Sequence, residues 1–305
     1  MNRRVVLLLA LCLSGCRFWY KPVPVADAIG EERTVFDGDS VNIYRDGRFE
    51  VYGRNAEAVY DGYEQLNRAY RAFERHFGVV PPKLAFVLTN DTTKPVQPAT
   101  IKSFADRGFR LVRYVRPRSY KNPTRYGALG YGGVIWPVAP TAARIMLAEY
   151  AVHASGGAPW NEHSTHADDA AALERLPMWL RAAVIHLLGE AGTASTDLDD
   201  VRDHLGSVMP LRDLVTLVRP ASADSLLDPT RRGEADETTR LAAAQAATFG
   251  EFMIEREGYT VLAKLARGYL DGRSFNEMLA ELEHTPHDIK ELEARWRVWV
   301  ETREN

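Results

Sequence analysis

Sequence patterns typical of β-strands occur only in the first 139 residues of this chain, and helical patterns dominate the remainder. Val41–Tyr44 and Phe49–Tyr52 flank Asp46-Gly47, a dipeptide that favours the tight turn of a β-hairpin. Further strands are predicted at Lys83–Thr89, Phe109–Val115 and Gly133–Val138, and loops at about residues 90–108 and 117–130. Strands followed by helices predict an α+β fold, in which a mixed or antiparallel sheet with helices precedes a mostly helical C-terminal half.

Seven segments carry apolar residues at the spacing of an α-helix. They are Ala56–Phe77, Thr141–Ala154, Pro177–Leu188, Thr239–Glu257, Thr260–Leu270, Ser274–Glu283 and Asp288–Arg303. The third is apolar on nearly every side, so we expect it to be buried; only Arg181 and His186 break its pattern. Thr285-Pro286-His287-Asp288 predicts the start of the last helix, with Thr285 as its N-cap.

The first fifteen residues, MNRRVVLLLALCLSG, have the layout of a secretion signal. Arg3 and Arg4 make the start positive, Val5–Leu13 is apolar, and Ser14-Gly15 supplies small residues at a cleavage point. The apolar run is too short to remain as a membrane-spanning helix. These features predict export from the cytoplasm.

The run Leu13-Ser14-Gly15-Cys16 resembles the bacterial lipobox, a signal in which the cysteine is lipidated and becomes the mature N-terminus. The resemblance implies a palmitate-bearing membrane anchor on Cys16. Because Arg17 is not the aspartate that marks inner-membrane retention, it also implies an outer-membrane location facing the periplasm. The alternative is an ordinary signal peptide that happens to contain a cysteine.

Removal of the signal changes the composition of the mature chain. Cys12 leaves with the signal and Cys16 carries lipid, so no thiol remains for a disulfide or a metal. Loss of Arg3 and Arg4 changes the formal charge from −3 to −5, and an acidic chain gives no electrostatic reason to expect nucleic acid as a partner. We therefore predict a signal at residues 1–15, a lipidated tether at 16–32 and one domain at 33–305. That domain would have a strand-rich lobe at 33–139 and a helical lobe at 140–305.

The order of elements resembles a gluzincin metallopeptidase of the peptidase MA-like kind over roughly Val41 to Glu301. In that family an edge strand precedes a helix carrying H-E-x-x-H, and a second, buried helix has a pattern like P-x-W-L-x-E-G-x-A-E. The corresponding segments here are GGVIWPV, IMLAEYAVHAS and LPMWLRAAVIHLLGE, followed by a helical tail that contains ELEARWRVW. The resemblance implies a zincin-like fold.

The catalytic motif of that family is not reproduced. Two histidines four residues apart bind zinc, and the glutamate between them is the general base. Alignment on the glutamate places Glu149 at the base position, but Ala148 and Val152 at the histidine positions and Ala182 at the third-ligand position. The sequence therefore predicts a degenerate active site and no cofactor.

A relocated zinc site is the alternative. Glu149 and His153 share a helix face, His186 lies one turn beyond Ala182, and His163 and His166 follow in the next loop. Each histidine also has a simpler interpretation. His153 suits a helix C-terminus, His186 suits a hydrogen-bonded core position, and the two loop histidines suit a solvated surface.

A cleft beside an edge strand could still bind an extended peptide by strand addition. Trp136 and Trp160 could supply aromatic contacts, and Arg181 could neutralise an acidic group; core packing and a salt bridge are their alternatives. We therefore predict a non-catalytic module that binds a peptide or an envelope protein, or acts as a scaffold. A zinc metallopeptidase with relocated ligands and a purely structural lipoprotein remain the other hypotheses.

Overall fold

The computed structural model describes residues 32–91, 93–115, 138–158, 160, 166–189, 194–217 and 237–303, without the side chains of 166 and 194–197. The described part of the chain from Arg33 onward forms one compact unit. Residues 16–31 of the predicted tether, including Cys16, lie outside the described residues, and Glu32 begins the first strand. His163, Trp136 and the predicted strand Gly133–Val138, except Val138 itself, also lie outside them. No helix in the described part is long and apolar enough to span a membrane.

The described strands form one five-stranded mixed sheet in the order β1-β2-β3-β4-β5. The strands are β1 (Glu32–Phe36), β2 (Asp39–Arg45), β3 (Phe49–Gly53), β4 (Lys83–Thr89) and β5 (Phe109–Val115). β2 and β3 pair antiparallel as the predicted hairpin, whereas β3–β4 and β4–β5 pair parallel. The crossover between β3 and β4 is α3 (Ala56–Phe77), which ends at Gly78 in the left-handed conformation.

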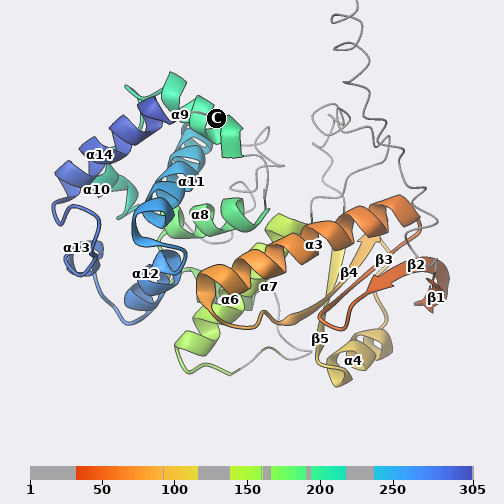
Figure 1. Ribbon diagram of the computed structural model, residues 1–305. Helices are drawn as coiled ribbons and strands as arrows, with labels where there is room; N and C mark the ends of the chain where they lie inside the picture. Colours follow the sequence, from red (N-terminus) through yellow and green to blue (C-terminus); the bar gives the residue numbers. More distant parts are fainter. Residues whose placement is uncertain are drawn as a thin grey trace, which may run out of the picture. The chain divides into compact units, whose positions relative to one another are not determined.

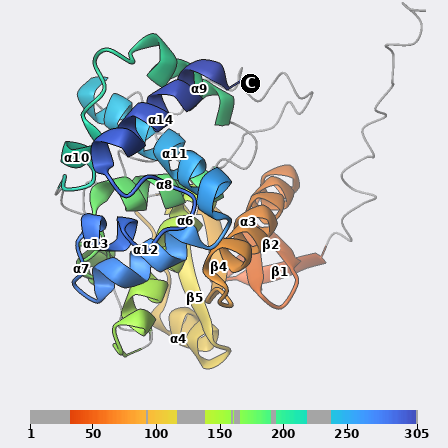
Figure 2. The ribbon, with the colours of Figure 1, turned by 60° about the vertical axis from the view of Figure 1, so that its left-hand side comes forward.

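The two faces of the sheet have separate hydrophobic cores because successive strand residues point to opposite faces. On β4, Leu84, Phe86 and Leu88 belong to the large core under α3. Ala85 and Val87 belong to a smaller cluster on the other face. Figures 1 and 2 show α3 along one face and α4 (Pro98–Asp106) against the other.

The large core continues without interruption into the helical half, and it includes Trp179 and Phe249 as well as Phe86 of the sheet. The helices that follow β5 in the described chain are α6 (Ala139–Ala154), α7 (His166–Leu173), α8 (Met178–Gly189), α9 (Ala194–Asp203), α10 (Leu211–Leu214), α11 (Glu237–Glu257), α12 (Val261–Leu270), α13 (Phe275–Leu279) and α14 (Ile289–Thr302). α8 is buried along almost its whole length, as predicted. The α+β class with a mostly helical second half is therefore confirmed.

Helices α8 and α11 approach closely at one point. A Cβ added at Gly250 of α11 would lie 2.7 Å from Cβ of Ala183 on α8, so only glycine fits there without movement of the helices. Trp179 of α8 packs on Phe249 of α11, with ring centroids 5.2 Å apart. Small and large residues therefore alternate along this helix contact.

Several predicted loops contain helices. α4 lies within residues 90–108, where Pro98 occupies the first turn and Phe104 is the residue that the helix buries. α7 begins at His166, in the segment expected to be a loop between α6 and α8. α9 and α10 also went unpredicted. α4, α7 and α9 have nine, eight and ten residues and α10 has four, which is too short for a clear helical period in the sequence.

Helix ends in the C-terminal part also differ from the prediction. The N-cap of α14 is Asp288, not Thr285, because the Asp288 side chain accepts hydrogen bonds from the N–H groups of Lys290 and Glu291 at 2.9 and 3.0 Å. The helix expected at Ser274–Glu283 is limited to Phe275–Leu279. Its start is fixed by a capping box between Ser274 and Glu277.

Candidate functional site

Glu149 lies on α6 at the position that corresponds to the general base in the gluzincin resemblance. It is 8% exposed. Its Oε1 accepts a hydrogen bond from the guanidinium of Arg110, with an N–O distance of 3.3 Å, and the two side chains form an ion pair. The carboxylate at the base position is therefore already held by a cation that belongs to the protein.

Arg110 reaches Glu149 because of the register of β5. Val112 and Tyr114 on the same strand point into the large core, and Arg110 shares their face by alternation. Leu111, which lies between Arg110 and Val112 in the sequence, packs against the cluster on the opposite face. Arg110 is consequently 5% exposed and points toward the helices instead of toward solvent.

A second carboxylate completes this cluster. The guanidinium of Arg110 also donates a hydrogen bond to Asp169 of α7, which is 7% exposed. The same guanidinium lies 5.7 Å from the ring centroid of Trp160. One buried cation therefore joins β5, α6 and α7, and Trp160 packs against it.

The environment of Glu149 raises its pKa above the ordinary value. Burial is the main cause, because it disfavours the charged form. Arg110 and the backbone N–H of Trp160 act in the opposite direction, while the negative charge of Asp169 adds to the increase. The ion pair therefore offsets only part of the cost of placing this carboxylate in the core.

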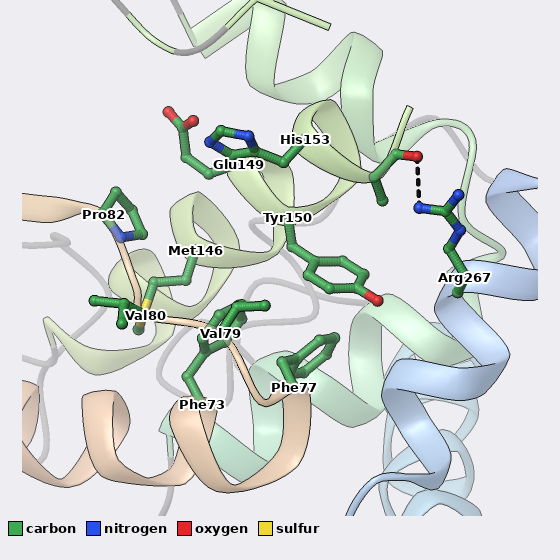
Figure 3. A pocket seen from close by; sticks show the side chains of 11 residues that line it. Phe73, Phe77, Val79, Val80, Pro82, Met146, Glu149, Tyr150, His153 and Arg267 are labelled. Carbon is green, nitrogen blue, oxygen red and sulfur yellow. Dashed lines mark hydrogen bonds between the residues drawn. The ribbon is translucent and has the colours of Figure 1, made fainter. Parts of the chain in front are cut away.

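A pocket of about 570 Å³ opens beside Glu149. Its lining is mostly apolar and comes from the end of α3, the loop after it, α6 and α12. In Figure 3, Glu149 and His153 project from α6 on one side, and Phe73, Phe77 and Val79 lie on the opposite side. Such a cavity has the size and the lining of a small-ligand or side-chain site.

Two polar groups of the pocket are committed to structural contacts. The Tyr150 hydroxyl donates to the backbone carbonyl of Ala263 at 3.3 Å. Arg267 donates to the carbonyl of Ala154 at 2.8 Å, drawn as the dashed line in Figure 3, and to Asp271 at 3.0 Å. His153, which is exposed, is the remaining polar side chain of the lining beside Glu149.

The candidate zinc ligands are only partly brought together. Glu149 and His153 line the same pocket, whereas His186 is buried in α8 at 4% exposure and is not part of that lining. His166 begins α7, but its side chain is outside the description, as is all of His163. Within the described ranges, no three His, Cys, Asp or Glu side chains are grouped so that they could hold a metal ion.

The positions at which the gluzincin resemblance would place zinc ligands hold no side chain that can bind a metal. Ala148 and Ala182 are buried at 1% and 2% exposure, and Val152 is half-buried. None of these side chains has an atom that can donate an electron pair to zinc. The remaining member of the motif, Glu149, is bound to Arg110.

Arg181 lies in the core of the helical half at 1% exposure. Its guanidinium donates hydrogen bonds to the backbone carbonyls of Leu173, at 3.3 Å, and Leu176, at 2.5 Å. Leu173 is the last residue of α7 and Leu176 lies between α7 and α8, so Arg181 donates to carbonyls where the two helices are joined. These contacts connect α7 to α8.

Sequence reasoning missed Arg110. The sequence contains a signal for it. Arg110 is a charged residue that alternates with Val112 and Tyr114 on one strand, so all three share the face that points into the core. A buried guanidinium needs hydrogen-bond acceptors, and Glu149, in a largely apolar helix, is a residue that can supply them.

Comparison with known proteins finds no matching family model, no matching curated protein and no matching solved structure.

Proposed function

We propose that this protein is a lipid-anchored component of the bacterial cell envelope, with a degenerate gluzincin-like domain of zincin-like fold. The domain binds a peptide or protein partner, or serves as a scaffold, and does not catalyse a reaction. The observation that carries this proposal is the buried ion pair between Arg110 and Glu149. It places a guanidinium on the one carboxylate that the catalytic motif retains.

The chemistry of peptide hydrolysis explains why this contact argues against catalysis. A gluzincin needs a zinc-bound water of lowered pKa and a carboxylate free to take its proton. Glu149 instead accepts a hydrogen bond from Arg110, and alanines and a valine occupy the ligand positions. A carboxylate alone gives little hydrolytic power.

The alternative is a zinc metallopeptidase with relocated ligands. Its support is that Glu149 and His153 line one pocket, one helical turn apart. It would require Glu149 to exchange Arg110 for a metal ion. We favour the non-catalytic hypothesis because the existing ion pair already compensates Glu149.

A cleavage assay separates these two hypotheses. The purified mature protein is incubated with an unfolded protein substrate, with added zinc and with a chelator, beside the Glu149→Gln variant. We expect no cleavage above the substrate blank and no difference between the two proteins. Cleavage that the chelator stops and that Glu149→Gln abolishes would establish the metallopeptidase instead.

Lipid anchoring is tested by growing expressing cells with labelled palmitate. We expect label on the wild-type protein and none on Cys16→Ser. Cys12→Ser is the matched control, because this cysteine lies within the proposed signal and its loss should leave the label unchanged. An unlabelled wild-type protein that is released in soluble form would refute the anchor.

A further inference from the structure

The C-terminal end of α3 carries an unusual amount of exposed apolar surface. Five large hydrophobic residues of the described chain are markedly exposed, and three of them lie on two segments that meet here: Val79 and Val80 directly after α3, and Tyr259 just before α12. Val80 is 82% exposed and Tyr259 is 55% exposed. Isolated exposed hydrophobic residues are ordinary, but a cluster indicates an interaction site.

A hydrogen bond connects the two chain segments that carry these residues. Gly78 ends α3, and Val79 and Val80 follow it directly. The next two residues are prolines, which restrict the backbone conformations available to this loop. The loop that carries Tyr259 is fixed to α3, because Nδ1 of His76 lies 2.8 Å from the Tyr259 carbonyl oxygen. We call Val79, Val80 and Tyr259 the apolar tip.

Four positive side chains lie on the elements that carry or adjoin the apolar tip. The guanidinium of Arg75 lies 5.1 Å from the ring centroid of Tyr259. Lys83 is exposed at the start of β4, and α12 exposes Lys264 and Arg267 one turn apart. Arg267 lines the same pocket as Val79 and Val80, although its ion pair with Asp271 compensates part of its charge.

From this combination we infer that the apolar tip and its basic rim form a surface that binds an anionic lipid bilayer. Apolar side chains that enter the boundary between headgroups and acyl chains contribute burial, and lysines and arginines beside them attract anionic headgroups. Tyrosine suits this boundary because its ring is apolar and its hydroxyl is polar. Because the chain as a whole carries a net negative charge, attraction to an anionic membrane would have to come from a local group of positive side chains such as this one.

This inference goes beyond the proposed function and does not require the lipid anchor. The surface should bind a bilayer even when Cys16 is replaced. Anchor and tip would then be two membrane contacts of one molecule.

The test is vesicle sedimentation of the mature chain with Cys16→Ser, which removes the lipid. Vesicles of phosphatidylcholine alone are compared with vesicles containing one-third phosphatidylglycerol, at low and at high salt. We expect binding to the anionic vesicles, weaker binding at high salt and little binding to the neutral ones.

Matched variants locate the binding surface. Val80→Asp should lower the binding constant by tenfold or more, since it replaces an inserting side chain with an anion. Val298→Asp is the control, because Val298 is also an exposed valine, 56% exposed, on α14, which packs on α9, α10 and α11. Lys264→Glu should lower binding by at least about fivefold. Each variant is checked for an unchanged thermal unfolding midpoint.

Three results would overturn the inference. They are no binding to anionic vesicles, equal binding to neutral and anionic vesicles, and equal losses in Val80→Asp and Val298→Asp. The first would leave the apolar tip as a docking site for a protein partner. None of these results would change the outcome expected in the cleavage assay or in palmitate labelling, so failure of this inference can be distinguished from failure of the proposed function.

Discussion

The guanidinium of Arg110 lies 3.3 Å from the carboxylate of Glu149, so an ion pair inside the core joins β5 to α6. Both side chains are at most a tenth exposed. Buried pairs of this kind contribute little net stability compared with apolar residues of similar shape, but removal of one partner leaves a buried charge uncompensated. The Arg110–Glu149 pair is therefore best tested by deleting one side.

Arg110→Met should lower the free energy of unfolding by about 3–5 kcal/mol, because Glu149 and Asp169 would lose the guanidinium that both contact. Chemical denaturation measures this change. Arg113→Met is the matched control on the same strand. Arg113 points to the opposite face, is half-buried and contacts the carbonyl of Asp91, so its loss should cost less than about 1 kcal/mol. Similar losses in the two variants would contradict the importance of the buried cluster.

Gly250→Ala should destabilise the protein by about 1–3 kcal/mol, because the added Cβ would stand 2.7 Å from that of Ala183 and force α8 and α11 apart. Gly206→Ala is the control, since nothing lies within 4 Å of a Cβ added there. Thermal unfolding of both variants measures the difference. An unchanged midpoint for Gly250→Ala would mean that the two helices are farther apart than the structure has them.

Glu257 makes a pH-dependent contribution to stability. Burial alone would raise its pKa, but the backbone N–H groups of His284 and Glu283 donate to its carboxylate and lower the pKa below the ordinary value of 4.5. An acid with a lowered folded pKa stabilises the fold above its ordinary pKa, and this contribution is lost as the pH falls through the lowered value.

Glu257→Gln should therefore cost about 1.5–3 kcal/mol at pH 7, and the difference from wild type should shrink as the pH falls below 4.5. Urea denaturation of both proteins from pH 7 to pH 3 measures the difference. If the difference in unfolding free energy between the two proteins stays constant or grows on acidification, the charge of Glu257 is not what stabilises the segment at His284.

Arg181→Met should lower the free energy of unfolding by at least about 1.5–3 kcal/mol, because the guanidinium is buried and donates to the carbonyls of Leu173 and Leu176. The rate of amide hydrogen exchange should increase most at the end of α7. A variant of normal stability that loses affinity for a partner would return Arg181 to the ligand-binding role suggested by the sequence.

Strong local patterns made much of the fold predictable. Asp46-Gly47 between two short apolar runs predicts the β2–β3 hairpin, and Gly78 predicts the end of α3. The short helices were missed because their stability comes from tertiary contacts. α4, for example, is held by Phe104, whose ring lies 5.6 Å from that of Tyr52 on the sheet. The sequence of α4 alone does not indicate which distant residue it packs against.

The candidate site was predictable only in part for a related reason. Glu149 could be singled out from its own helix, but its partners come from β5 and α7, 39 residues before it and 20 after it. Parallel pairing of β4 with β5 sets which face Arg110 occupies, and that pairing depends on the whole sheet. Glu149 could therefore be identified from one helix, whereas its partner Arg110 could be identified only from the fold.

Zinc content of the purified mature protein distinguishes a domain in which Arg110 holds Glu149 from a metallopeptidase with relocated ligands. The protein is loaded with a small excess of zinc, desalted and measured by mass spectrometry beside His153→Ala and His186→Ala. We expect far less than one zinc per chain, with no difference among the three proteins, because Arg110 already holds Glu149. One zinc per chain that either histidine variant loses would contradict the non-catalytic hypothesis.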